Sequence, residues 1–224
     1  MSQNNDPRQQ LVDCIRMLEK ADIIDHNGHV SIRYGDNLLI NNGSAVKGLL
    51  TEDDLVEIDM DGNVVSGKGK PPLEFHIHTE IYRARPDVQS VAHTHPKWST
   101  FLTMVGKPYK HVYAQGVLLG DMPVMDTPLS VNTKPMGERL AKTLGKRPAV
   151  LLKSHGVTIV GSNMVECFAL AAYVEENCYR QYMAEQLGEP YEFSEEEKKA
   201  CFEKLWSPSL FQKTWDHYRS KVAG

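Results

Sequence analysis

Two histidines at the end of a short apolar run most constrain how this chain can fold. The run Gln89–Ala92 is followed at once by His93, Thr94, His95 and Pro96. In an extended strand, residues two apart project from the same face, so His93 and His95 can present both imidazoles to one point. Pro96 cannot donate a ladder hydrogen bond, which places the pair at the last residues of a strand, where α/β sheets hold their ligand sites.

Two more residues complete a possible ligand set. Glu74 lies one predicted helix before the histidine strand, and His155 stands between a serine and a glycine after an apolar run. Singly, each has an ordinary explanation as a surface carboxylate near a helix start or as a turn histidine. Together, three neutral imidazoles and one carboxylate suit a catalytic divalent ion, zinc above all. We therefore predict a metal site formed by Glu74, His93, His95 and His155.

Hydrophobic periodicity and turn signals predict strands and helices that alternate through short connections. The predicted strands span residues 29–33, 37–40, 56–60, 64–65, 89–95, 149–152 and 157–160. The predicted helices span residues 9–24, 73–84, 97–105, 135–144, 164–186, 195–204 and 208–222. Because no Pro/Gly/Ser-rich linker interrupts this order, we expect one α/β domain over residues 1–224, in which residues from about 190 onward form a helical C-terminal tail.

The composition is that of an ordinary soluble globular protein, with 41% hydrophobic and 24% charged residues. A net charge of -4 gives no electrostatic reason to expect nucleic acid or an anionic membrane as a partner. No apolar run is long enough for a membrane span, and the polar N-terminus lacks a secretory signal. The four cysteines form no Cys-x-x-Cys pair, so free thiols and a reducing cytoplasm are expected.

Several motifs together resemble the class II aldolase/epimerase/adducin-head family over nearly the whole chain. They are Gly28–Arg33, Glu74, Ile81–Val88, His93–Pro96 and Ser154–Gly156. The resemblance implies an α/β/α sandwich, a small-molecule substrate and a homotetramer with active sites between subunits. It also implies a zinc ion held by the three histidines, with Glu74 as a further ligand and as the acid/base. Manganese or another transition metal is the alternative for such a site.

The sequence departs from the sugar-phosphate members of the family at the positions that bind phosphate there. His29 replaces an asparagine, Asn41–Ser44 replaces a Thr-Pro-Ser/Thr-Gly turn, and Pro72-Leu73 replaces a pair of serines. Two hydroxyl donors and one amide are thereby lost, and an underpaired phosphate is costly in a pocket. The sequence is more similar here to decarboxylases of hydroxylated aromatic dicarboxylates such as dihydroxyphthalates.

The remaining candidate residues come from the same resemblance. Tyr113 lies where aldolases of the family carry a tyrosine acid from a neighbouring subunit, and His111 competes for that role because the alignment slips there. The candidates for substrate binding are Asn27, His29, Gly43, Ser44 and His78. A packed turn histidine is the alternative for His29, and a structural histidine is the alternative for His78.

We therefore expect a metal-dependent carbon–carbon lyase, and we favour a decarboxylase that acts through a metal-chelated, enolate-like intermediate. An aldolase or 4-epimerase acting on a sugar or sugar phosphate, such as a fuculose- or ribulose-phosphate-like ketose, is the alternative. A non-catalytic scaffold like the adducin head ranks last, because such scaffolds are expected to lose metal ligands and all four are present here.

Overall fold

A single mixed sheet organises the computed structural model, which describes residues 6–222. Its eight strands run in the order β4-β3-β2-β1-β5-β8-β7-β6. They are β1 (His29–Tyr34), β2 (Asn37–Asn41), β3 (Leu55–Ile58), β4 (Val64–Gly67), β5 (Ser90–Thr94), β6 (Val124–Met125), β7 (Ala149–Leu152) and β8 (Gly156–Gly161). Neighbouring strands are antiparallel, except that β6 and β7 are parallel.

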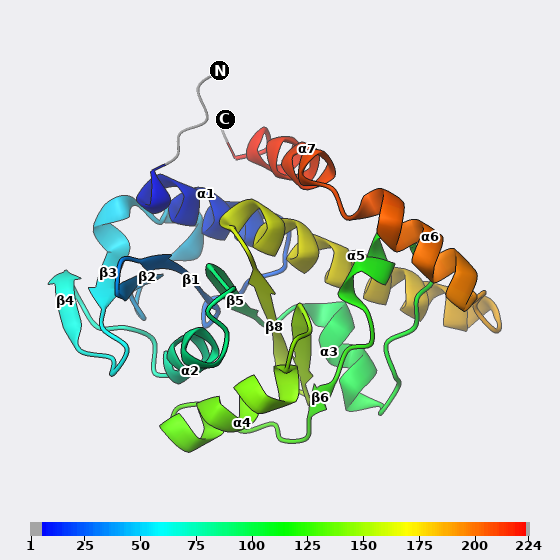
Figure 1. Cartoon of the computed structure of the whole chain (residues 1–224), viewed down its shortest axis with the longest axis horizontal. Coiled ribbons are helices and arrows are strands. Elements are labelled where there is room, and N and C mark those ends of the chain that lie inside the picture. Colours follow the sequence, from blue (N-terminus) through cyan, green and yellow to red (C-terminus); the bar gives the residue numbers. More distant parts are fainter. Residues whose placement is uncertain (1–5, 223–224) are drawn as a thin grey trace.

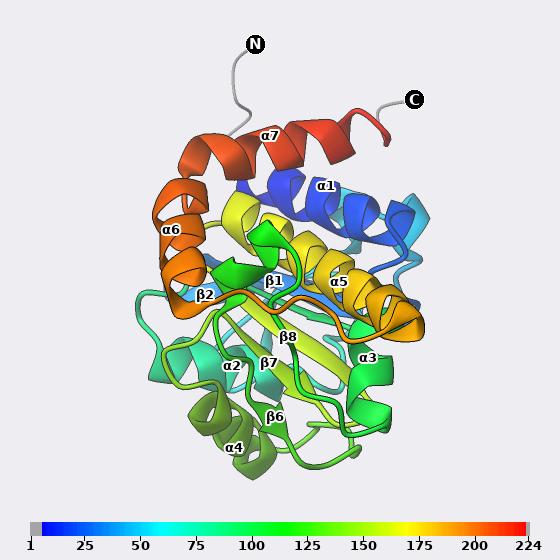
Figure 2. The same ribbon diagram turned by 90° about the vertical axis from the view of Figure 1, so that its right-hand side faces the viewer.

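Helices cover both faces of this sheet (Figure 1). They are α1 (Pro7–Lys20), α2 (His76–Ala84), α3 (Lys97–Met104), α4 (Lys134–Leu144), α5 (Met164–Leu187), α6 (Glu195–Leu205) and α7 (Pro208–Arg219). Figure 2 shows α1, α5 and α7 on one side of the sheet and α2 and α4 on the other. The predicted single-domain α/β/α sandwich is thus confirmed. No helix in the part of the chain that the structure describes is long and apolar enough to cross a membrane.

Each face of the sheet buries its own hydrophobic core. On one side, the apolar stripe of α1, including Leu11, Ile15 and Leu18, packs with α5 against the sheet. On the other side, α2 and α4 bury Ile77, Ile81 and other aliphatic residues. Helix α5 is buried over most of its length because the sheet, α1, α3 and α7 pack around it. The four cysteines are free, as predicted, and three of them are buried.

The start of one predicted helix needs correction. The helix predicted from Leu73 begins at His76, because Pro71 and Pro72 hold the preceding chain extended and residues 73–75 form a turn. Glu74 therefore precedes α2 instead of lying on one of its faces. The histidine pair lies at the end of β5, as predicted, although β5 pairs antiparallel with both β1 and β8 and the rule for parallel sheets is therefore not the reason.

The antiparallel pairing gathers three chain segments at one edge of the sheet. His29 at the start of β1 lies opposite His93 near the end of β5, and Thr158 of β8 also pairs with His93. The turn between β7 and β8 therefore reaches the end of β5. A Cβ atom on Gly156 would lie 2.2 Å from the Thr94 carbonyl oxygen and 2.9 Å from His95 Cδ2. Only glycine permits this approach.

We expect Gly156→Ala to destabilise the fold, because the backbone of β5 cannot move away from the new methyl group. Overpacking of this kind costs about 1–3 kcal/mol in the free energy of unfolding, measurable by urea denaturation. Gly48→Ala is the matched control, since its Cβ would meet only the flexible Glu19 carboxylate. Equal stability of the two variants would contradict the proposed close packing.

Candidate metal centre

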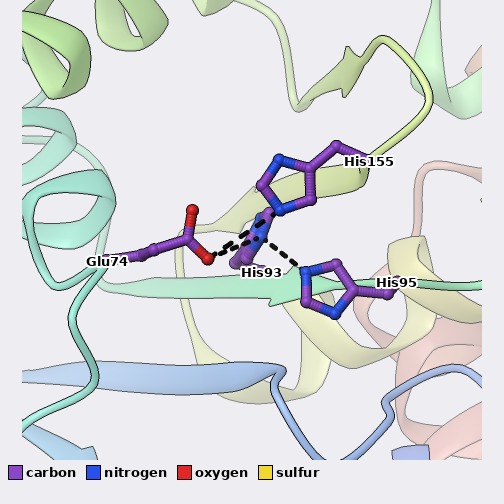
Figure 3. A group of neighbouring side chains, drawn as sticks. All are labelled: Glu74, His93, His95 and His155. Atoms are coloured by element: carbon purple, nitrogen blue, oxygen red, sulfur yellow. Dashed lines mark hydrogen bonds and ion pairs between the residues drawn. The ribbon is translucent and has the colours of Figure 1, made fainter. Parts of the chain in front are cut away.

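Four side chains converge at this edge of the sheet, and they are the four predicted from the sequence. Glu74 comes from the turn before α2, His93 from β5, His95 from the residue after β5, and His155 from the β7–β8 turn. Figure 3 shows all four pointing toward one another. One ligand atom from each lies within 4.8 Å of the others.

Three of the spacings between these atoms are close to those around a tetrahedral ion. The Nε2 atoms of His93 and His95 are 3.1 Å apart, while Glu74 Oε2 lies 3.7 Å from His93 Nε2 and 3.8 Å from His155 Nε2. Zinc bonds of about 2.0–2.1 Å imply ligand atoms about 3.3 Å apart at the corners of a tetrahedron. The nitrogen and carboxylate donors are also the types that zinc prefers.

Partners outside the cluster turn the imidazoles toward it. Asp25 Oδ1 accepts a hydrogen bond from His95 Nδ1 at 2.8 Å, and His93 Nδ1 lies 3.0 Å from Thr158 Oγ1. Because a carboxylate only accepts, His95 carries its proton on Nδ1 and keeps a free lone pair on Nε2. Such a partner fixes the tautomer and orientation of a metal-binding histidine.

Asp25 was not singled out from the sequence. Its Oδ1 also accepts the backbone N–H groups of Asn27 and Gly28, each at 2.9 Å, and so forms the turn that leads into β1. The Asp-x-Asn-Gly pattern signals this turn. It does not reveal that the same carboxylate reaches His95, which is distant in the chain.

The protonation states suit metal binding. Burial alone would raise the pKa of Glu74, but the nearby His29 and the Val131 N–H, which donates to Oε1 at 2.6 Å, lower the pKa to about 2. Burial and the neighbouring imidazoles lower the pKa of His93 well below its usual value, and burial also lowers the pKa of His155. Near neutral pH the site therefore combines an ionised Glu74 with neutral imidazoles at His93 and His155.

A cavity of about 730 Å³ opens above the cluster. It is lined by Asp25, Asn27, His29, Gly43, Pro71, Pro72, Leu73, Glu74, His95, Pro128, Ser130, Ser154 and His155. None of these lining residues is a lysine or arginine. Two carboxylates and a wall of proline and leucine are present instead.

The predicted substrate-binding residues divide between the cavity and its surroundings. Asn27, His29 and Gly43 line the cavity, although the Gly43 N–H already donates to the Lys70 carbonyl at 2.9 Å. Ser44 does not line it, because the Asx turn directs the Ser44 hydroxyl to Asn42 Oδ1 at 2.9 Å.

His78 also departs from the prediction. It is fully buried behind His29, outside the cavity, and its Nε2 lies 2.7 Å from His29 Nδ1. The prediction that His78 shares a helix face with Glu74 required both residues to lie in α2. Because α2 begins at His76, Glu74 lies outside the helix and this spacing does not apply.

The two predicted second proton donors lie elsewhere on the same chain. His111 donates from Nε2 to the Gly120 carbonyl at 3.2 Å and faces α6. Tyr113 lies beside α5 and α7, and the Arg180 guanidinium carbon stacks over it, 4.3 Å from the centroid of the Tyr113 ring. Asn177 Oδ1 accepts the Tyr113 N–H at 3.1 Å and holds this segment. Neither donor lines the metal cavity of its own chain, so their roles stay predictions about a neighbouring subunit.

Comparison with known proteins agrees with this architecture. The model of the class II aldolase and adducin N-terminal domain family matches residues 9–182, and the chain belongs to that family. An L-fuculose phosphate aldolase from Methanocaldococcus jannaschii is 31% identical over 172 residues, which cover 76% of this chain and 92% of the relative. A 5-methylthioribulose-1-phosphate/5-deoxyribulose-1-phosphate aldolase from Rhodospirillum rubrum is 30% identical over 179 residues, 80% of each chain.

Solved structures show the same fold. An L-fuculose 1-phosphate aldolase superposes with a TM-score of 0.81 at 26% identity, covering 91% of this chain and 97% of the other. An aldolase II superfamily protein from Pseudomonas syringae gives a TM-score of 0.87 at 21% identity and covers 99% of this chain and 94% of the other.

We expect Asp25→Asn to weaken zinc binding by about 10–100-fold, because the His95 imidazole loses the anion that orients it. Competition against a chromophoric chelator measures the affinity. Asp36→Asn, an exposed change in the β1–β2 turn, is the control and should bind zinc like the parent protein. An unchanged zinc affinity in Asp25→Asn would show that Asp25 does not support metal binding.

Stability of the metal-free protein should fall as the pH decreases from 7.5 to 5.5. Burial lowers the pKa of His29, His78, His93 and His155, so these imidazoles stay neutral when folded but take up protons below about 6.5 when unfolded. The unfolded state then binds more protons, and each such histidine removes up to about 1.4 kcal/mol per pH unit. Urea unfolding across this range tests the sign; a flat profile contradicts it.

Proposed function

We propose that this protein is a divalent-metal-dependent lyase that cleaves a carbon–carbon bond of a small hydroxy-ketone by a retro-aldol reaction. The observation that carries the proposal is the convergence of Glu74, His93, His95 and His155 at the floor of an open cavity. The aldolase names of the relatives support aldol cleavage over the decarboxylation favoured from sequence. An ion in this cluster, with zinc as the family default, supplies a Lewis acid that offsets negative charge when the bond breaks.

Glu74 is suited to hold the proton that such a cleavage moves. The Val131 N–H holds Oε1, so Oε2 is left facing the histidines and the cavity. Aldol cleavage removes a proton from a substrate hydroxyl and adds one to the carbon that keeps the bonding electrons. An ionised carboxylate can accept the first at Oε2 and return it to that carbon, which closes the proton balance.

A second proton donor would have to come from another copy of the chain. Tyr113 and His111 both lie away from the cavity of their own subunit. Leu73 and Leu129, beside the cavity, are 81% and 64% exposed, and exposed apolar side chains around a cleft are typical of a surface that another subunit covers. We therefore propose a homo-oligomer, a tetramer by family, in which Tyr113 or His111 completes a neighbouring site.

Decarboxylation of a hydroxylated aromatic acid is the second candidate. It is favoured by the composition of the cavity wall, where the prolines and Leu73 offer apolar surface and no lysine or arginine is available for a phosphate. A flat ring would pack against such a wall, whereas a phosphate dianion would be desolvated without a cation from this chain.

We expect the zinc-loaded protein to release a triose or glycolaldehyde phosphate from ketose 1-phosphates, or the corresponding neutral fragments from unphosphorylated ketoses. Glu74→Gln should lower turnover by about 10²–10⁴-fold, the usual contribution of a positioned acid/base. His76→Gln is the control, because His76 lies two residues away but outside the cavity. A coupled assay of the released carbonyl product measures both variants.

The same preparations distinguish the alternatives. Release of carbon dioxide from dihydroxyphthalates without any aldol cleavage would replace the first proposal by the second. A protein that binds no metal and turns over neither substrate class would point to a scaffold.

A further inference from the structure

A buried chain of polar side chains leads away from the cavity on the side of β1 and α2. His29 Nδ1 lies 2.7 Å from His78 Nε2, and His78 Nδ1 lies 2.6 Å from Ser31 Oγ. Ser31 Oγ is in turn 2.8 Å from the Tyr82 hydroxyl. None of the four is more than 2% exposed. We call this chain of four residues the His29–Tyr82 relay.

Hydrogen atoms can be arranged along the relay in two directions. In one, Tyr82 donates to Ser31, Ser31 to His78 Nδ1, and His78 Nε2–H to His29 Nδ1. In the reverse direction the Tyr82 hydroxyl is left to donate to the Gln89 carbonyl, which is 3.5 Å away and beyond the usual range. The first direction satisfies every hydrogen inside the relay.

The first direction also agrees with the charge that faces it. It places the remaining proton of His29 on Nε2, which lies 3.9 Å from Glu74 Oε2. A ring N–H next to a carboxylate is attracted, whereas a bare nitrogen lone pair in the same place would be repelled. Geometry and electrostatics thus select the same tautomer for both histidines.

The end of the relay beside the cavity is a donor without an acceptor. His29 Nε2 is buried and has no hydrogen-bond partner among the described residues, since 3.9 Å is too long for a hydrogen bond to Glu74. His29 nevertheless lines the cavity. A buried donor left without a partner is costly, so an oxygen of a ligand entering the cavity would gain from accepting it.

We propose that His29 is a specificity-determining residue that donates a hydrogen bond from Nε2 to a substrate oxygen. His78, Ser31 and Tyr82 are positioning residues that hold the required tautomer. The selected ligands are those that place a carbonyl, hydroxyl or carboxylate oxygen beside Glu74. The relay ends at buried Tyr82, so it fixes a donor and carries no proton to solvent. The role toward substrate rests on the proposed lyase function, whereas the tautomer does not.

The tautomers of His29 and His78 can be measured without any catalysed reaction. Long-range ¹H–¹⁵N correlation spectra of ¹⁵N-histidine-labelled, zinc-loaded protein should show His29 and His78 both protonated on Nε2, with assignments from His29→Gln and His78→Gln. Ser31→Ala should move the His78 resonances toward those of a mixture of tautomers. Tyr82→Phe should leave the His78 resonances unchanged, because Ser31 still donates to His78 Nδ1. A proton on Nδ1 of either ring in the parent protein overturns the proposal.

The contact with a ligand needs a separate measurement. Acetohydroxamate, a small chelator with two acceptor oxygens, serves as the probe on cobalt-loaded protein, followed by visible absorption. Loss of one hydrogen bond in His29→Phe should weaken its binding by about tenfold, and His29→Gln, which keeps an N–H donor, should recover most of it. Zinc affinity should be equal in both variants.

Equal acetohydroxamate affinity in His29→Phe and the parent would overturn the specificity role even if the tautomers are as proposed. This readout requires no aldol cleavage. A failure of the lyase proposal would appear instead as absent turnover in a protein that still binds the probe.

Discussion

The approach of the β7–β8 turn to the end of β5 is the contact on which the rest of the site depends. Gly156 leaves room for the Thr94 carbonyl, and that closeness brings His155 within reach of His93 and His95. The strand register adds His29 to the same edge, opposite His93. An antiparallel sheet achieves here what parallel sheets achieve at their carboxyl ends, because the start of β1, the end of β5 and a hairpin turn lie together.

The ligand residues at this end of the sheet carry negative charge without a positive charge among them. Glu74 is held ionised by surrounding donors, and burial keeps His93 and His155 neutral, so these three ligand residues supply an anion and lone pairs but no cation. A divalent ion would complete that arrangement, and its charge would balance Glu74 and Asp25. The two carboxylates act differently, since Asp25 orients an imidazole while Glu74 faces the ligand atoms directly.

The cavity walls set this chain apart from a simple phosphate-binding design. Pro71, Pro72 and Leu73 form one side, and the neighbouring Gly43 amide is already bonded to a backbone carbonyl. His29 introduces a donor whose direction is fixed from behind by buried groups. Chemistry common to the family can therefore persist at the cluster while the residues around it differ.

Strand and helix periodicity in the sequence predicted the α/β layers, and the alternation of His93 and His95, joined by Glu74 and His155 as a ligand set, predicted the four ligands. Their convergence depends on the fold, since His155 is far from His95 in the chain. Other contacts depended on tertiary structure. Asp25 reaches His95 across 70 positions, and His78 meets His29 across 49. Such pairs form only when distant segments pack together, and neither hydrophobic period nor turn chemistry encodes them. The distance of Tyr113 from the cavity was decided in the same way, by packing that a one-dimensional pattern cannot express. The boundary of α2 and the position of Ser44 have local causes instead, namely the prolines before α2 and the Asx turn at Asn42, which the hydrophobic period does not register.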